Sequence, residues 1–236
     1  MLGTAWDYQD YPDEFIAKLA AIEERGVTVC NPPAVVRWNA DKRYLDELAQ
    51  QGAAIVPTLW RRDLGRAGVQ GAMAHFATDR VVVKRQVGAG GIGQHSFARD
   101  SLPDDSWTMG CPCMVQPFLP SVVEEGEFTY VFIDGAFSHG VCKRAGPDDY
   151  RIQSLYGGYE TPYTPDARDL AAAQAVVAAL PFEPLLYARI DMVRLPSGTL
   201  AVMEAELIEP YLYPEQADNL GEVVARAVRA RLPSGS

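Results

Sequence analysis

The apolar residues near the start of the chain follow the spacing of a helix. Residues 13–25 place four of them on one side of a predicted helix: Phe15, Ile16, Leu19 and Ile22. Gly26 is placed to end this helix, because glycine readily adopts the left-handed backbone found at helix C-termini. The next segment, residues 27–33, carries a short apolar run stopped by two prolines and predicts a short strand.

A second helix and a second strand continue this alternation. Asn39 is placed to cap a helix over residues 40–51, because its side chain can accept a hydrogen bond from a free first-turn amide. Gly52 is placed to end that helix, and residues 53–59 predict another short buried strand. The first sixty residues therefore predict an α/β region with short elements.

Strand patterns dominate beyond residue 80. Seven segments have the apolar and β-branched content of strands: 81–87, 94–99, 112–118, 127–134, 136–144, 185–195 and 199–208. Asp134-Gly135 is a strong hairpin signal, and residues 196–198 mark a second turn. Two further helices are predicted over residues 165–180 and 217–232. Runs of antiparallel strands with a few helices indicate an α+β fold.

The net charge and the cysteine content limit the classes of binding partner and the cellular compartment that we expect. A formal net charge of −10 over 236 residues argues against nucleic acid and anionic membranes, because both favour basic surfaces. No apolar run approaches the ~20 residues needed to span a bilayer, and no signal peptide is visible. The four cysteines lack the spacing of a redox or zinc site, so free buried thiols in a reducing cytoplasm are expected.

Residues 81–97, VVVKRQVGAGGIGQHSF, contain the first candidate chemistry. Gly88, Gly90 and Gly93 have the G-x-G-x-x-G spacing of a dinucleotide-binding turn. That turn needs a helix directly after its third glycine, whereas a strand pattern follows here. A P-loop ends in Gly-Lys-Ser/Thr, which is absent, and a kinase loop precedes its lysine, whereas Lys84 comes before the glycines.

What remains is a strand, a lysine, a glycine loop and a second strand. Backbone amides without bulky side chains can close over phosphates, with Lys84 supplying positive charge beneath them. The alternative is a plain glycine turn or bulge. Four glycines within residues 88–93 exceed what a turn needs, which favours the phosphate lid.

The hairpin around residues 196–198 contains the second candidate chemistry. A turn that pairs Leu195 with Leu200 makes two polar pairs face each other: Asp191 with Glu204, and Arg189 with Glu206. Strand alternation then gives the hairpin one polar face. The opposite face carries only apolar residues: Ile190, Met192, Met203, Ala205 and Leu207.

The three carboxylates on this polar face have two explanations. Carboxylates gathered on one face repel one another unless a cation joins them, and oxygen-only ligands favour Mg²⁺ or Mn²⁺ over zinc. The alternative is a solvated acidic face with a cross-strand ion pair between Arg189 and Glu206. Glu209, near the strand end, fits either explanation.

In combination, these two regions resemble the ATP-grasp superfamily, and within it enzymes like bacterial glutathione synthetase. The resemblance runs from about residue 39 to residue 212 and rests on the order and spacing of several motifs: NADKRYL, VVVKRQVGAGGIG, MVQPFLP, EEGEFTYVFIDGAFSHGVCKR, YRIQSLYGG, RIDMV and MEAELIEP. A weaker resemblance, through WDYQ, NPP and ELIEPYLY, is to the branch near the cycloserine-forming cyclo-ligase.

The resemblance implies roles for residues of these motifs. ATP would be held by two lysines, a mobile glycine lid, an adenine-binding strand and an acid at the ribose: Lys42 and Lys84; Gly90 and Gly91; Gln116, Pro117, Phe118 and Leu119; and Glu127. Catalytic contacts to the phosphates would come from Lys143 and Arg151. The Mg²⁺ or Mn²⁺ ligands would be Asp191, Glu204 and Glu206.

The resemblance also implies the domain plan: two α/β subdomains that grip ATP, within an α+β, ATP-grasp fold. Residues 1–60 would be a reduced N-terminal α/β region, and residues 61–236 the ATP-binding domain, with a lid subdomain over about 61–115. Two departures stand out. The family often has asparagine where this chain has Glu206, and only about sixty residues precede the ATP-binding part, so the N-terminal domain is reduced or truncated.

The activity implied is an ATP-dependent carboxylate–amine, or cyclising, ligase that works through an acyl-phosphate. Its partners would be small carboxylate and amine substrates and a second copy of the chain in a homodimer, with neither nucleic acid nor membrane. A function of another class, in which ATP binding regulates a partner interaction without catalysis, is the alternative, and the reduced N-terminal region favours it.

Overall fold

The computed structural model describes residues 1–2, 5, 7–146 and 157–232. Its helices are η1 (Tyr8–Asp10), α1 (Pro12–Glu24), α2 (Pro33–Ala40), α3 (Tyr44–Gln50), α4 (Arg66–Phe76), α5 (Ser121–Glu124), α6 (Ala167–Ala178), η3 (Pro214–Gln216) and α7 (Leu220–Arg231). Its strands are β1 (Leu59–Arg61), β2 (Arg80–Arg85), β3 (His95–Ala98), β4 (Cys113–Pro117), β5 (Glu127–Ile133), β6 (Ala136–Arg144), β7 (Tyr159–Tyr163), β8 (Tyr187–Arg194) and β9 (Leu200–Glu206). The α+β prediction is confirmed.

The larger sheet has five antiparallel strands in the order β7-β6-β5-β8-β9. Period-two alternation gives it one apolar face, which α3 and α6 cover and which holds the main core, including Tyr130, Phe132, Ile190 and Met192. The opposite face carries the charged residues of β5, β6, β8 and β9. The fold therefore buries one face of this sheet and leaves the other for chemistry.

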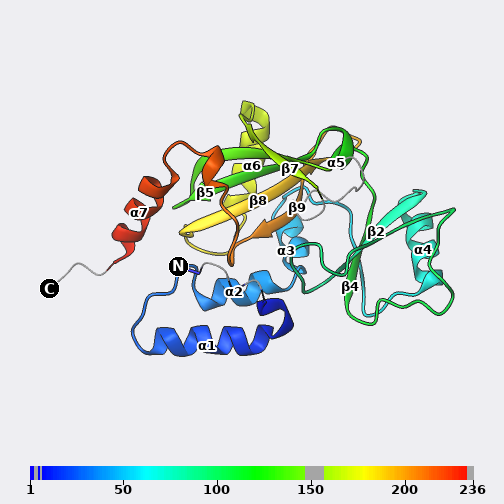
Figure 1. Ribbon diagram of the computed structural model, residues 1–236, viewed down its shortest axis with the longest axis horizontal. Coiled ribbons are helices and arrows are strands. Elements are labelled where there is room, and N and C mark those ends of the chain that lie inside the picture. The colour runs from blue at the N-terminus through cyan, green and yellow to red at the C-terminus, as the bar shows by residue number, and fades with distance from the viewer. Residues whose placement is uncertain (3–4, 6, 147–156, 233–236) are drawn as a thin grey trace.

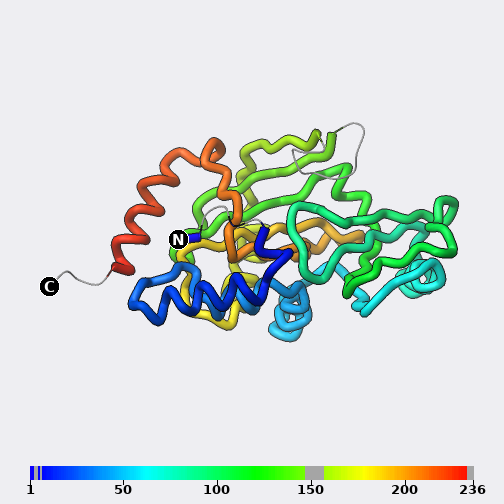
Figure 2. The backbone as a smooth tube through the Cα atoms, turned by 60° about the horizontal axis from the view of Figure 1, so that its bottom comes forward, coloured from blue at the N-terminus to red at the C-terminus, as the bar shows by residue number. Residues whose placement is uncertain are grey.

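The smaller sheet has four antiparallel strands in the order β1-β4-β2-β3 and packs against α4. In Figures 1 and 2 this sheet and α4 form one end of the molecule, and α7 lies at the other end. Along β2, Val81 and Val83 face α4, whereas Val82 and Lys84 face the larger sheet. Strand alternation thus aims the lysine of the glycine loop at the charged face opposite.

The N-terminal helices α1 and α2 lie side by side and share a small core with Ile208, just beyond β9. The helix α7 packs on the end of β5 through Leu220 and Ala227. Consequently the first forty residues border the strand that carries two of the predicted metal ligands.

Both predicted hairpin turns are present. Asp134 and Gly135 have φ angles of 54° and 74°, the left-handed pair that a tight two-residue hairpin needs. Residues 196–198 close the β8–β9 hairpin, where Leu195 N donates to Thr199 O. The β2–β3 hairpin around the glycine loop also matches the prediction, with Val83 opposite His95.

Three predictions for the first sixty residues are wrong. Residues 27–32 form no strand, and the second of the two prolines starts α2. Asn39 caps no helix, since it lies within α2 and its side chain binds the backbone of Ala205 and Leu207. Residues 53–58 form only one isolated bridge to the larger sheet. The Asn39 side chain satisfies buried backbone groups at the end of β9, and these hydrogen bonds outweigh the local preference of asparagine for a helix cap.

The register of the β8–β9 hairpin differs from the prediction at its turn. Asp191 faces Glu204 and Arg189 faces Glu206, as predicted, but Leu200 pairs with Arg194 and not with Leu195. A bulge between Asp191 and Met192 absorbs the one-residue difference. As a result, Met203 leaves the apolar face and lines the same cavity as Glu204.

The four cysteines are free, as predicted, although Cys30 and Cys111 are only half-buried. No helix of the described residues is long and apolar enough to cross a membrane.

Candidate active site

A cavity of about 590 Å³ lies between the two sheets. Both sheets, the glycine loop, the N-terminal η1 and the segment after β9 contribute to its wall. Nearly all of the predicted site residues line it: Lys42, Lys84, Gly90, Gly91, Gln116, Pro117, Phe118, Leu119, Glu127, Lys143, Asp191, Glu204 and Glu206. The fold thus brings together residues that are up to 164 positions apart in the sequence.

One end of the cavity is apolar. It is formed by the end of β4 and the residues after it, together with Val82, Val122 and Met203. Gln116 is buried and its Nε2 donates to Thr58 Oγ1 at 3.0 Å. A flat apolar slot bordered by strand backbone suits an aromatic base.

The glycine loop joins β2 to β3 above this slot. Gly90, Gly91 and Gly93 have φ angles of 62°, 71° and 70°, a conformation that side chains rarely tolerate. The loop is held from two sides: Lys42 Nζ donates to Gly88 O, and Gln9 Oε1 accepts from Ala89 N at 2.7 Å. These two hydrogen bonds hold the loop at the cavity in this conformation.

Lys84 projects into the cavity from β2, directly before the loop. Burial lowers its pKa, although Glu204 and Glu127 lie near enough to oppose that effect. Among the residues that the structure describes, none forms a hydrogen bond or an ion pair with its ammonium group. Lys84 is half-buried, and an ammonium withdrawn in part from water without an anion is unfavourable, so the geometry favours an anionic ligand at this point.

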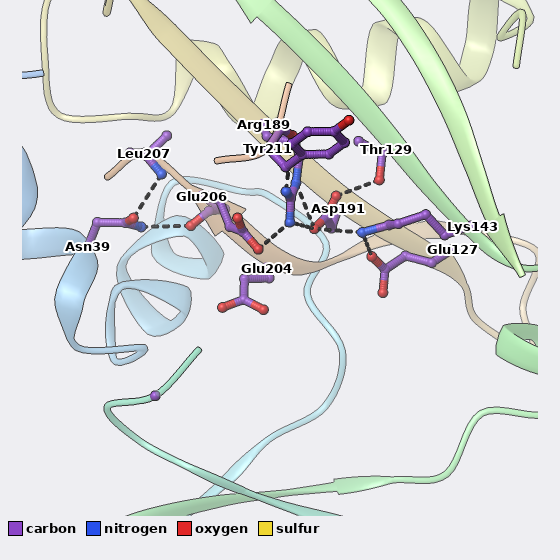
Figure 3. Close-up of polar contacts among 12 residues, drawn as sticks. Asn39, Glu127, Thr129, Lys143, Arg189, Asp191, Glu204, Glu206, Leu207 and Tyr211 are labelled. Carbon is purple, nitrogen blue, oxygen red and sulfur yellow. Dashed lines mark hydrogen bonds and ion pairs between the residues drawn. The ribbon is translucent and has the colours of Figure 1, made fainter. Parts of the chain in front are cut away.

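Asp191 is at the centre of the charged face (Figure 3). It is 2% exposed, and Thr129 Oγ1 donates to its Oδ1 at 2.6 Å. Lys143 Nζ and Arg189 Nη2 lie 3.0 and 2.9 Å from its Oδ2. Burial alone would raise the pKa of Asp191, but these two cations outweigh it and hold the pKa below its ordinary value.

The other carboxylates on this face each contact a cation too. Glu127 pairs with Lys143, Glu206 with Arg189, and Glu204 with Lys42 at 3.0 Å. Burial raises the pKa of Glu206 to about 8, since the repulsion from Glu204 and Asp191 adds to it and Arg189 only partly offsets it. The Arg189–Glu206 pair expected for an acidic face is therefore present.

The metal assignment stays a prediction. The β8–β9 register does place Asp191, Glu204 and Glu206 on one face, with oxygen atoms as the only candidate ligands. However, in the described part of the chain no three acidic, histidine or cysteine side chains form a group that could hold a metal ion. A metal could bind Glu204 and Glu206 only after their ion pairs with Lys42 and Arg189 rearrange. Arg151 lies outside the described residues.

Several cavity residues were absent from the predicted site: Tyr8, Gln9, Arg189, Glu209, Tyr211 and Tyr213. Strand alternation places Arg189 on the carboxylate face, so the signal for it exists in the sequence. Arg189 bridges Asp191 and Glu206 and donates to Tyr211 O at 3.2 Å (Figure 3). Nothing in the local pattern of residues 8–9 indicates that a single turn of 3₁₀ helix would contact the glycine loop.

Comparison with known proteins agrees with this arrangement. The cycloserine biosynthesis protein DcsG of Streptomyces lavendulae is 30% identical over 243 aligned positions, which take in 96% of this chain and 81% of that protein. The glutathione synthetase of Prochlorococcus marinus is 29% identical over 186 positions, which take in 74% of this chain and 56% of that protein. No protein-family model matches the chain.

Solved structures agree with the sequence relatives. The crystal structure of the D-cycloserine synthetase DcsG superposes with a TM-score of 0.81 at 26% identity, covering 98% of this chain and 82% of that one. The ATP-grasp ligase PsnB superposes with a TM-score of 0.66 at 17% identity, covering 94% of this chain and 71% of that one. The resemblance inferred from the motifs is thus confirmed: the chain belongs to the ATP-grasp superfamily of ATP-dependent carboxylate–amine ligases.

Proposed function

We propose that this chain joins a small carboxylate to an amine by way of an acyl-phosphate, with ATP bound in the cavity between its two sheets. The observation that carries this proposal is the placement of Lys84, a half-buried lysine whose ammonium has no partner in the described chain, between an apolar slot and a face of carboxylates. The apolar slot suits the base of a nucleotide, and the unpaired cation beside it suits the phosphates. The acidic face suits the cations that accompany those phosphates.

In this proposal the adenine lies in the slot along Gln116, Pro117, Phe118 and Leu119. The glycine loop covers the phosphates, and Lys42 and Lys84 contact them. Glu127 lies within reach of the ribose hydroxyls, and Lys143 holds charge near the transferring phosphate. Residues 61–115 form the lid, and the chain associates as a homodimer; both remain predictions.

Mg²⁺ or Mn²⁺ would be held by Asp191, Glu204 and Glu206, whose oxygen atoms suit a hard cation. When bound, the metal supplies positive charge that neutralises the phosphate oxygens. With the metal on Glu204 and Glu206, Lys42 and Arg189 would contact phosphate and substrate. The ion pairs seen here offset most of the negative charge of the carboxylate face.

The chemistry then needs two displacements. A substrate carboxylate oxygen attacks the γ-phosphorus of ATP, the bond to the β-phosphate oxygen breaks, and ADP leaves. The amine nitrogen next attacks the acyl-phosphate carbonyl carbon, and inorganic phosphate leaves with its bonding electron pair and one proton. Arg189 and Lys143 hold negative charge in both steps, and the glycine loop excludes water, which would otherwise hydrolyse the acyl-phosphate.

The similarity to DcsG favours a cyclising form of this reaction, in which carboxylate and amine belong to one molecule. DcsG is named as the synthetase of D-cycloserine, and that name denotes a cyclic product. A small substrate fits a cavity of about 590 Å³ that must also hold a nucleotide.

Hydroxylamine tests this function, because it intercepts an acyl-phosphate as a hydroxamate. With Mg-ATP and a panel of small carboxylic acids, including both enantiomers of amino acids, at least one acid is expected to yield hydroxamate and ADP in equal amounts. Mg-ATP that raises the unfolding temperature while no acid yields either product would favour the alternative, a non-catalytic module that ATP regulates.

A further inference from the structure

Glu209 is the one buried carboxylate of the cavity that has no partner in the described part of the chain. It follows β9 directly before Pro210, lines the cavity and is 8% exposed. Asp191, Glu127, Glu204 and Glu206 all pair with lysine or arginine, whereas nothing among the described residues donates to the carboxylate of Glu209. A carboxylate buried to this degree needs a cation or a donor.

The described groups around Glu209 supply neither a contacting cation nor a hydrogen-bond donor. Burial raises its pKa to about 7, and repulsion from Glu204 adds to this, while Arg189 and Lys42 are near enough to lower it but do not contact it. Glu209 is also the charge that most raises the pKa of Tyr8, so the phenol and the carboxylate share this end of the cavity. The carboxylate of Glu209 therefore still lacks a positively charged partner.

Two kinds of cation could fill this position, and the surroundings discriminate between them. Mg²⁺ binds several oxygen ligands and keeps water, whereas the cavity lining next to Glu209 in the sequence is aromatic and apolar. Tyr8, Ile208 and Tyr211 line the cavity beside Glu209. Aromatic and apolar walls around one carboxylate suit an organic ammonium group, which gains from aromatic faces as well as from the charge.

We propose that Glu209 binds an ammonium group carried by the carboxylate substrate, which makes that substrate an amino acid. This inference rests on the proposed function and adds to it. Arg189 donates to Tyr211 O, two residues beyond Glu209, so a cation and an anion both lie at one short segment of the cavity wall. A zwitterion satisfies both: its carboxylate lies toward Arg189 and the transferring phosphate, and its ammonium lies on Glu209 with Tyr8 beside it.

Matched acid pairs test this proposal in the hydroxylamine assay with Mg-ATP. The pairs differ only by one amino group: alanine and propionate, serine and 3-hydroxypropionate, 2,3-diaminopropionate and 3-aminopropionate, with both enantiomers of each amino acid. The wild-type protein is expected to prefer an amino acid in at least one pair. Glu209→Gln, which keeps the shape and removes the charge, is expected to raise the KM for that amino acid about 10- to 100-fold.

The KM for Mg-ATP and the unfolding temperature of Glu209→Gln are expected to match those of the wild type. The control is Glu215→Gln, the same chemical change at an exposed position of η3, which is expected to alter neither KM. Equal rates within every pair, or an unchanged amino-acid KM in Glu209→Gln, would overturn the proposal. A KM for Mg-ATP that rises in step would overturn it as well, by showing Glu209 to be a metal ligand. Mg-ATP binding without hydroxamate or ADP from any acid would remove the proposed function itself, and this inference with it.

Discussion

Changing Asp191 to asparagine is expected to abolish ligase turnover and to destabilise the fold by about 3–5 kcal/mol. Lys143 and Arg189 are both buried against Asp191, which among the described residues is the only carboxylate that contacts both of them, so removing its charge takes a counter-ion from each cation. Urea unfolding measures the stability, and ADP release measures turnover. Because the folded-state pKa of Asp191 lies below the ordinary 3.8, the stability difference is full above that pH and shrinks below it.

The matched variant is Glu204→Gln on the facing strand. The side chain of Glu204 is 31% exposed, and Lys42 keeps its hydrogen bond to Gly88 O when that charge is lost. Its stability is therefore expected to change by less than about 1 kcal/mol, while turnover is lost as in Asp191→Asn. If Asp191→Asn is as stable as Glu204→Gln, the buried ion-pair network contributes nothing to the fold and this description of it is wrong.

Changing Lys84 to methionine is expected to lower activity without lowering stability. Stability is expected to stay the same or rise, because a half-buried ammonium without a described partner becomes an apolar side chain of similar length. The kcat/KM for ATP is expected to fall about 10²- to 10³-fold, since one preorganised cation at the phosphates is lost. Chemical denaturation and initial rates of ADP release measure the two effects.

Lys18→Met provides the control for Lys84→Met. Lys18 is an exposed lysine of α1 that pairs with Glu14 one turn earlier, and its side chain does not line the cavity. Its loss is expected to change neither ATP kinetics nor, by more than a few tenths of a kcal/mol, stability. A Lys84→Met variant with unchanged ATP kinetics would place the phosphates elsewhere.

Strand periodicity predicts the centre of this site from sequence because it needs only local information. The two-residue repeat of a strand determines which side chains share a face, and the hairpin turn sets the register to within one residue. These two rules place Asp191, Glu204 and Arg189 on one face, where the structure has them. The position of Lys84 can be predicted in the same way, since its place in β2 follows from the apolar residues before it.

Long-range contacts explain what the pattern could not predict. Asn39 has the sequence context of a helix cap, yet it binds the backbone of Ala205 and Leu207, 166 and 168 positions away. Gln9 holds the glycine loop across 80 positions, and no periodic signal marks such a contact. No glycine marks the bulge that turns Met203 into the cavity. In the sequence Glu209 differs little from its acidic neighbours, since burial, not residue type, makes it unusual.

Oxygen transfer is the most direct measurement of the central claim that a substrate carboxylate attacks the γ-phosphate. An acid that yields hydroxamate is labelled with ¹⁸O in its carboxylate and incubated with unlabelled Mg-ATP and its amine, and the released phosphate is analysed by mass spectrometry. One ¹⁸O atom is expected in each inorganic phosphate, together with ADP. Unlabelled phosphate, or ¹⁸O in AMP with pyrophosphate released, would contradict it.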